Sequence, residues 1–279
     1  MVTKPHLTRY ASQDVTLLGD QRRPGGVTLA FTERTGGRSL SPYESLNQGD
    51  SCGDDAQDVA ANRTILLDAM GMGELGERLV NPLQVHGSDV VVISSGTSEA
   101  VHEAQAQARQ GADAIVCSAA DVPVLLCFAD CVPVVLVADG AFAVVHSGWK
   151  GTYARIAAKA LRKLTELAGC KAADVLAYIG PHIGGADYEV SHGLAETFAT
   201  EFGAGVTPSE RHLDLGAAVR IALEAEGMRP EAIIDECPST ASCTERFFSY
   251  RAEGGACGRH GAIAALLSDA HGEVSADGR

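Results

Sequence analysis

Apolar residues gather into short runs between residues 111 and 147, and these runs predict the centre of the fold. The runs ADAIVCS, PVLLCFA, PVVLVA and AFAVVHS are rich in Val, Ile and Leu, while Gly, Pro and Asp separate them. Runs that are apolar throughout, without alternating polar residues, are typical of strands buried on both faces. We therefore expect this stretch to form adjacent strands of a buried sheet.

The rest of the chain alternates between helical and extended patterns. Apolar residues at helical spacing predict helices over residues 55–71, 153–169, 191–203 and 213–228. Short apolar runs predict strands over residues 27–32, 78–87, 89–94, 174–180 and 232–236. The polar segments predict a long loop over residues 33–55 and a loop with one helical turn over residues 95–110.

This alternation, without an internal repeat or a Pro/Ser-rich linker, predicts a single α/β domain. We expect one or two central mixed β-sheets flanked by helices. The domain is expected to span residues 28–267, with an irregular N-terminal lead-in over residues 1–27 and a disordered tail over residues 268–279.

Composition narrows the class of protein. Hydrophobic residues make up 46% of the chain and charged residues 21%, which is typical of a globular protein. The formal net charge of −14 argues against nucleic acid or an anionic membrane as a partner. The N-terminal residues lack the apolar segment of a secretory signal, and eight scattered cysteines without a CxxC pair are typical of reduced thiols. A cytoplasmic protein is therefore expected.

Three residues carry candidate chemistry at the ends of apolar segments. Cys131 follows the triplet FAD, His146 ends AFAVVH, and His86 ends the motif NPLQVH. Zinc binds thiolate and imidazole, and a catalytic zinc site has three protein ligands and one open position. The spacing by itself enforces no cluster, so each residue also has a structural reading, as a small buried thiol or a hydrogen-bonded core imidazole.

Six motifs together resemble one known family, and they are SLNQGD, QVHG, FADCVPVVL, VVHSGWKGT, IGPHIGGADYEV and CTERFFSYRAEGG. They resemble the laccase-domain, or polyphenol-oxidase-type, family over about residues 28–267. The resemblance implies a fold similar to that of cysteine deamidase toxins. It also implies a zinc ion bound by His86, Cys131 and His146, and a monomer or homodimer.

The resemblance further implies a zinc-dependent purine nucleoside phosphorylase. Such an enzyme converts a purine nucleoside and phosphate to the free base and ribose 1-phosphate. Adenosine, inosine, guanosine and S-methyl-5′-thioadenosine are the implied substrates, with adenosine deaminase as a side activity. Because the H-x-E and P-C-x-x-C signature of other zinc deaminases is absent, deamination here would require a different solution.

Four residues in these motifs and the early loop are expected to contact the substrate: Arg34, Asn47, Lys150 and Arg251. HSGWKG replaces the family's commoner HAGWRG, so Lys150 offers a point charge instead of a bidentate fork. Lys150 stands at a predicted helix start, which favours an anion, so phosphate is expected at this turn.

Two residues near these motifs require separate treatment. Asp130, beside Cys131, is either an orienting or basic group or a turn acid that ends a strand. His182 stands where the family's GPCIGPCCYEV has a cysteine, so no role of the family's additional cysteines transfers to this chain.

Other functions stay open at this level. A metal-free cysteine hydrolase or amidase would use Cys131 as nucleophile and His146 as base, but would leave His86 without a role. A copper-dependent polyphenol oxidase would suit the family's older name, and copper can displace zinc in vitro. However, no methionine stands near a ligand motif and no His-x-His occurs. Hydrolysis of wrongly built peptidoglycan precursors and a non-catalytic binding role complete the alternatives.

Overall fold

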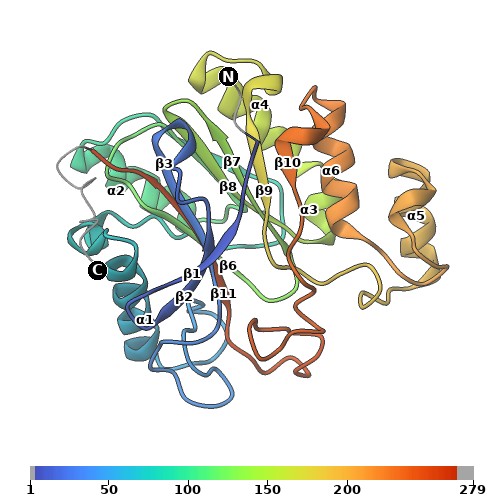
Figure 1. Cartoon of the computed structure of the whole chain (residues 1–279), viewed down its shortest axis with the longest axis horizontal. Coiled ribbons are helices and arrows are strands. Elements are labelled where there is room, and N and C mark those ends of the chain that lie inside the picture. The colour runs from blue at the N-terminus through green and yellow to red at the C-terminus, as the bar shows by residue number, and fades with distance from the viewer. Residues whose placement is uncertain (1–3, 269–279) are drawn as a thin grey trace.

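Two β-sheets pack face to face in the computed structural model, which describes residues 4–268, and helices cover both outer sides (Figure 1). The first sheet has five strands, which pair in antiparallel fashion in the order β1-β2-β3-β11-β6. These strands are β1 (Thr8–Ser12), β2 (Val15–Gly19), β3 (Val27–Thr32), β11 (His260–Leu266) and β6 (Val124–Phe128).

The second sheet is mixed and has the order β10-β9-β7-β8-β5-β4. Its strands are β4 (Val90–Ile93), β5 (Ala114–Cys117), β7 (Val132–Ala138), β8 (Ala141–Ser147), β9 (Leu176–Ile179) and β10 (Ile233–Ile234). The outer pairs β4–β5 and β9–β10 are parallel, and the inner pairs are antiparallel.

Six α-helices accompany the sheets within the described part of the chain. They are α1 (Ala56–Ala69), α2 (Ser98–Arg109), α3 (Trp149–Tyr153), α4 (Ile156–Ala168), α5 (His192–Phe202) and α6 (Leu215–Ala225). Helices α4, α5 and α6 contribute to the apolar cluster on the outer face of the second sheet. Helix α1 covers the outer face of the first sheet, so the layers are helix, sheet, sheet, helices.

Strand β7 shows why the central runs are apolar throughout. Its seven residues are all buried, because both of its faces lie under other layers. Val135 and Val137 point into the core between the sheets, whereas Val134 and Leu136 point toward the helices. Each such side chain contributes about 1.5–3 kcal/mol by burial, so the strand that leads away from Cys131 is firmly held.

The predicted α/β class and the central strands are confirmed, and three local predictions are wrong. Residues 8–12 and 15–19, expected to be irregular, form the β1–β2 hairpin, whose partly exposed outer strand shows little apolar pattern. Residues 78–87, expected to be a strand, form a loop after the 3-10 helix Gly73–Arg78, with a single β-bridge from Val80 to Val124. The loop curves because the backbone N–H groups of His86 and Gly87 both donate to the carboxylate of Asp113. Residues 98–109 form a full helix whose buried side chains are small, namely Val101, Ala104 and Ala108.

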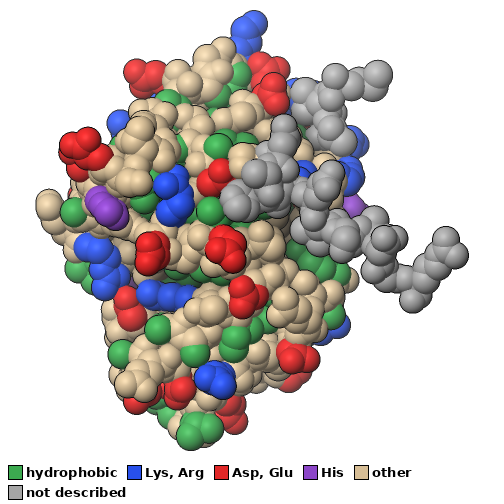
Figure 2. Space-filling model, turned by 90° about the vertical axis from the view of Figure 1, so that its left-hand side faces the viewer, with side chains coloured by type: hydrophobic (Ala, Val, Ile, Leu, Met, Phe, Trp, Pro, Cys, Tyr) green, Lys and Arg blue, Asp and Glu red, His purple; other side chains and the backbone are tan. Residues whose placement is uncertain are grey.

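One face of the molecule carries charged side chains of both signs (Figure 2). On the face in Figure 2, acidic and basic side chains are interspersed with apolar ones. Within residues 4–268 no helix has the length and apolar character that crossing a bilayer requires. The predicted tail over residues 268–279 lies outside the described residues, apart from Ser268.

Candidate metal centre and its cavity

The antiparallel pairing of β7 with β8 brings Cys131 and His146 together. A tight turn at residues 139–140 joins the two strands, and Val132 lies opposite Ser147 while Pro133 lies opposite His146. Cys131 directly precedes β7, so it lies beside the last residues of β8. The register of one hairpin thus places a thiol and an imidazole side by side, although 15 residues separate them in the sequence.

Asp113 brings the third group, His86, to the same place. Asp113 directly precedes β5, the strand that pairs with β8. Its Oδ1 accepts a hydrogen bond from the backbone N–H of His86 at 2.9 Å, and its Oδ2 accepts one from Gly87 at 2.7 Å. The same carboxylate contacts Nδ1 of His146 at 2.8 Å. One buried carboxylate therefore fixes both histidines.

The ligand atoms of His86, Cys131 and His146 all lie within 4.8 Å of one another. His146 is buried, Cys131 is partly exposed and His86 is exposed, so the cluster opens to solvent on one side. Gly148 completes the packing, because a Cβ atom there would lie 2.9 Å from His86 and 3.1 Å from the Cys131 sulfur. His86 adopts a left-handed backbone (φ 56°), which is strain of a kind that functional sites often hold.

Electrostatics favour a thiolate at this cluster. Burial raises the pKa of the Cys131 thiol, but the charge of His146 and hydrogen bonds from both histidines outweigh this and lower the pKa to about 6. Burial lowers the pKa of His146, but the Cys131 thiolate and Asp113 together raise that pKa to about 9. Without a metal, the two residues thus form a thiolate–imidazolium pair over much of the neutral range.

The donor set fits a divalent zinc ion. Zinc binds thiolate at about 2.3 Å and imidazole at about 2.0–2.1 Å. The ligand atoms around one zinc ion must therefore lie close to one another, as the ligand atoms of His86, Cys131 and His146 do. A hydrogen bond from Nδ1 of His146 to Asp113 leaves Nε2 as the ligand atom, which is the usual arrangement of a carboxylate behind a metal-binding histidine. The imidazolium proton and any thiol proton leave when a metal binds.

A cavity of about 580 Å³ opens beside the cluster, within the usual range of small-molecule sites. His86, Cys131 and His146 line it together with Asp130, and aromatic side chains contribute to its wall. Trp149 and Tyr250 are 40% and 56% exposed, so they stand at its rim. The cavity therefore offers flat apolar surfaces close to the three candidate ligands.

The cavity wall holds two arginines beside the carboxylates of Asp50 and Asp130. Arg251 and Arg259 both line the cavity. The Arg251 guanidinium lies over the ring of Tyr188 at 5.2 Å, and the Arg259 guanidinium lies over that of Tyr250 at 5.8 Å. The two guanidinium groups are therefore the candidate contacts for an anion in this cavity.

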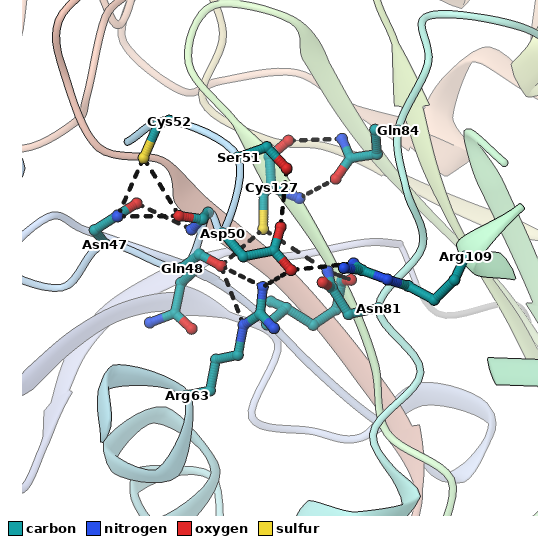
Figure 3. Close-up of polar contacts among 12 residues, drawn as sticks. Asn47, Gln48, Asp50, Ser51, Cys52, Arg63, Asn81, Gln84, Arg109 and Cys127 are labelled. Carbon is teal, nitrogen blue, oxygen red and sulfur yellow. Dashed lines mark hydrogen bonds and ion pairs between the residues drawn. The ribbon is translucent and has the colours of Figure 1, made fainter. Parts of the chain in front are cut away.

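The long early loop forms the other wall through residues 49–52. Figure 3 shows Asp50 of this loop beside Arg63 and Arg109. Asp50 forms ion pairs with Arg63 at 3.4 Å and Arg109 at 3.0 Å, which join α1 and α2 to this loop. Burial raises the pKa of the Asp50 carboxyl, but the two arginines outweigh this and hold the pKa below its ordinary value. Gln84 exchanges two hydrogen bonds with the backbone of Cys127, which fastens the His86 loop to β6.

The structure brings one of the four expected substrate contacts, Arg251, into the cavity wall. Arg34 donates to the carbonyls of Glu44 and Thr244 and pairs with Glu253, outside the lining residues. Asn47 is buried and holds the early loop, and it accepts a hydrogen bond from the Arg259 backbone N–H. Lys150 is exposed beside Trp149, and it does not line the cavity either. Direct substrate contact by these three residues stays a prediction.

Sequence reasoning missed Asp113, Tyr188 and Arg259. Asp113 resembles an ordinary turn acid before a strand, yet its side chain is fully buried and accepts hydrogen bonds from both histidine segments. An acid between an apolar strand and a glycine was the available signal, because buried carboxylates require partners. Tyr188 and Arg259 lie in segments whose approach to the cavity depends on long-range packing.

Comparison with known proteins supports the assignment suggested by the motifs. The family model described as "Multi-copper polyphenol oxidoreductase laccase" matches residues 28–267. A purine nucleoside phosphorylase of Corynebacterium glutamicum is 34% identical over 258 residues, which cover 91% of this chain and 99% of that protein. A purine nucleoside phosphorylase of Deinococcus radiodurans is 36% identical over 246 residues, covering 86% and 89%.

Solved structures agree with this assignment. YlmD from Geobacillus stearothermophilus has a TM-score of 0.81 at 29% identity, covering 95% of this chain and all 100% of that chain. The YfiH protein of Bacillus licheniformis has a TM-score of 0.79 at 28% identity, covering 91% and 97%. The motif resemblance is therefore confirmed, and the chain belongs to the multi-copper polyphenol oxidoreductase laccase family.

Proposed function

We propose that this protein is a zinc-dependent purine nucleoside phosphorylase that also deaminates adenosine. The observation that carries the proposal is the cluster of His86, Cys131 and His146 in the wall of a cavity that Arg251 and Arg259 also line. Relatives named purine nucleoside phosphorylase at 34% and 36% identity support the same reaction class. Adenosine, inosine, guanosine and S-methyl-5′-thioadenosine are the candidate substrates.

His86, Cys131 and His146 would hold the zinc ion, with Asp113 behind His146. A zinc ion bound there supplies a Lewis acid and lowers the pKa of water to about 7. Phosphorolysis breaks the bond between the base nitrogen and C1′ of the ribose, and a phosphate oxygen forms the new bond to C1′. The purine leaves with the electron pair of the broken bond and takes up a proton.

The chain's own residues would position the reactants. Arg251 and Arg259 provide fixed positive charge for phosphate, which costs no rearrangement during the reaction. Trp149 and Tyr250 offer rings at the cavity rim on which a purine can stack. Burial and the Cys131 thiolate raise the pKa of Tyr188, so its phenol stays protonated and can donate a hydrogen bond.

The decisive experiment measures products with and without phosphate. Protein purified without chelator is analysed for zinc and copper and is then incubated with inosine. We expect bound zinc and formation of hypoxanthine and ribose 1-phosphate, with no turnover when phosphate is omitted. Release of free ribose without phosphate would instead identify a nucleosidase. Incubation with adenosine, followed by a search for inosine, tests the deaminase activity.

Matched variants test the anion site. Arg251→Gln should raise the KM for phosphate by about 10- to 100-fold, because a charge-assisted hydrogen bond contributes about 1.5–3 kcal/mol. Arg162→Gln, on the outer face of α4, is the control and should leave that KM unchanged. Lys150→Ala tests the contact predicted from the sequence. A normal phosphate KM in Arg251→Gln, together with a raised one in Lys150→Ala, would move the anion to the α3 turn.

A metal-free cysteine hydrolase is the second candidate, and one observation favours it. Cys131, His146 and Asp113 are arranged as nucleophile, base and orienting acid, and the thiol pKa is about 6. That function predicts negligible metal in purified protein and a mild effect of His86→Ala. Full activity in protein stripped of metal would favour this candidate over the phosphorylase.

A further inference from the structure

Asp130 occupies a strained and buried position next to a candidate metal ligand. It directly precedes Cys131, and its backbone lies in the left-handed region (φ 86°) although it is not glycine. Its exposed fraction is 9%, and it lines the cavity beside the cluster. A non-glycine residue in this conformation costs about 1–3 kcal/mol, so other contacts must hold it there.

Those contacts join Asp130 to a segment more than 100 residues away in the sequence. Oδ1 accepts hydrogen bonds from the hydroxyls of Thr240 and Ser249, both at 2.7 Å. Oδ2 accepts one from the backbone N–H of Arg251 at 2.7 Å. The carbonyl of Asp130 also accepts the N–H of Ile183 at 3.0 Å, which adds another segment of the cavity wall.

Both carboxylate oxygens of Asp130 thus already accept hydrogen bonds from groups of the protein. This arrangement leaves little capacity for Asp130 to act as a base toward a substrate, one of the two sequence-based readings. It instead fixes where the backbone of residues 249–251 runs. A carboxylate that accepts three short hydrogen bonds in a buried site holds its partners strongly, because bonds to charged groups are about twice as strong as neutral ones.

The hydrogen bond from the Arg251 backbone to Asp130 also limits where the Arg251 side chain can lie. Its Nη1 donates to the carbonyl of Glu189 at 2.9 Å, and its guanidinium lies over the Tyr188 ring. Within residues 4–268, the remaining guanidinium N–H groups have no hydrogen-bond partner. Arg251 is therefore held at its backbone by Asp130 and at one nitrogen by Glu189, with further donors left for an anion in the cavity.

We propose that Asp130 is a positioning residue that fixes Arg251 relative to the Cys131 side of the cavity, so that an anion bound by Arg251 lies beside the metal cluster. This inference rests on the proposed phosphorolysis insofar as the anion is phosphate. Asp130 directly precedes Cys131, and its carboxylate accepts a 2.7 Å hydrogen bond from the backbone N–H of Arg251. One residue therefore links the candidate metal ligand Cys131 to the anion contact Arg251.

Asp130→Gly removes the carboxylate and suits the left-handed backbone at this position, so the Arg251 N–H loses its acceptor without added backbone strain. Asp130→Asn is the conservative variant and should retain the anchor. Its amide oxygen can accept from the Arg251 N–H, because the hydroxyls of Thr240 and Ser249 can turn to accept from the amide nitrogen. Asp187→Asn is the matched control, because Asp187 accepts a hydrogen bond from Ser242 in the same C-terminal segment but does not line the cavity.

Kinetics and metal binding test the role. In the holoenzyme, Asp130→Gly should raise the phosphate KM about tenfold, from the loss of one charge-assisted bond, while the nucleoside KM and the zinc content change less than twofold. Asp187→Asn should change neither KM. Equal loss of nucleoside and phosphate binding in Asp130→Gly, or an unchanged phosphate KM in that variant, would overturn the proposal.

A measurement independent of turnover separates this inference from the proposed function. Hydrogen exchange of the Arg251 amide, followed by NMR, should be slow in the wild type and at least tenfold faster in Asp130→Gly, with core amides of β7 unchanged. Equal exchange rates at Arg251 in both proteins would reject the anchor. If the wild type turns over inosine without phosphate, phosphorolysis fails, whereas the exchange rates still judge the role of Asp130.

Discussion

Asp113→Asn is the sharpest test of how the metal site is built. The carboxylate accepts four hydrogen bonds, from Nδ1 of His146 and from the backbone N–H groups of Val85, His86 and Gly87. An asparagine retains the shape but has one accepting oxygen, and its nitrogen donates. Each of the two possible amide orientations therefore damages the site in a different way.

In the first orientation the amide oxygen replaces Oδ1, and the nitrogen faces the N–H groups of Val85 and Gly87, which releases the His86 loop. In the second, the nitrogen faces His146 and requires Nδ1 to accept, so the proton moves to Nε2 and blocks the ligand atom. Losing such a partner behind a metal ligand typically costs 10–100-fold in metal affinity, which is about 1.4–2.7 kcal/mol.

The assay is zinc affinity by competition with a chelating dye, on protein stripped of metal and refilled. Asp20→Asn is the control, because Asp20 is also a buried carboxylate, but its partners Arg22 and Tyr178 do not line the cavity. We expect Asp20→Asn to lower the melting temperature and to retain zinc affinity. Wild-type zinc affinity in a folded Asp113→Asn protein would refute this reasoning.

Four further predictions rest on the same structure. His86→Ala should abolish zinc retention and turnover together, and full activity in the folded variant would count against the zinc site. In metal-free protein, iodoacetamide should alkylate Cys131 with a half-maximal rate near pH 6 instead of about 9. The ion pair of Cys131 stabilises the fold between about pH 6 and 9, because the thiolate is protonated below this range and its imidazolium partner deprotonates above it. Gly180→Ala places a Cβ 2.4 Å from the Phe31 ring and should cost about 1–3 kcal/mol in unfolding, whereas Gly193→Ala, which meets nothing within 4 Å, should not destabilise.

The sequence by itself determined the elements with strong apolar periodicity. Strands β7 and β8 and helix α4 were predictable because their runs bury one or both faces, and a long apolar run has few other stable outcomes. The candidate ligands His86, Cys131 and His146 were also recognisable, because they stand inside motifs that identify the family. Helix α2 escaped recognition, since alanine side chains contribute a weak hydrophobic signal.

Only the tertiary structure decided which residues share the cavity. Antiparallel pairing of β7 with β8 sets Cys131 beside His146, and a carboxylate at the start of β5 draws in the His86 loop. The same folding separates Arg34, Asn47 and Lys150 from the cavity wall and places Arg259 there. Residue type and spacing cannot distinguish these outcomes, because the direction of a side chain in a loop depends on contacts with distant segments, as Arg34 contacts Glu253 219 residues away.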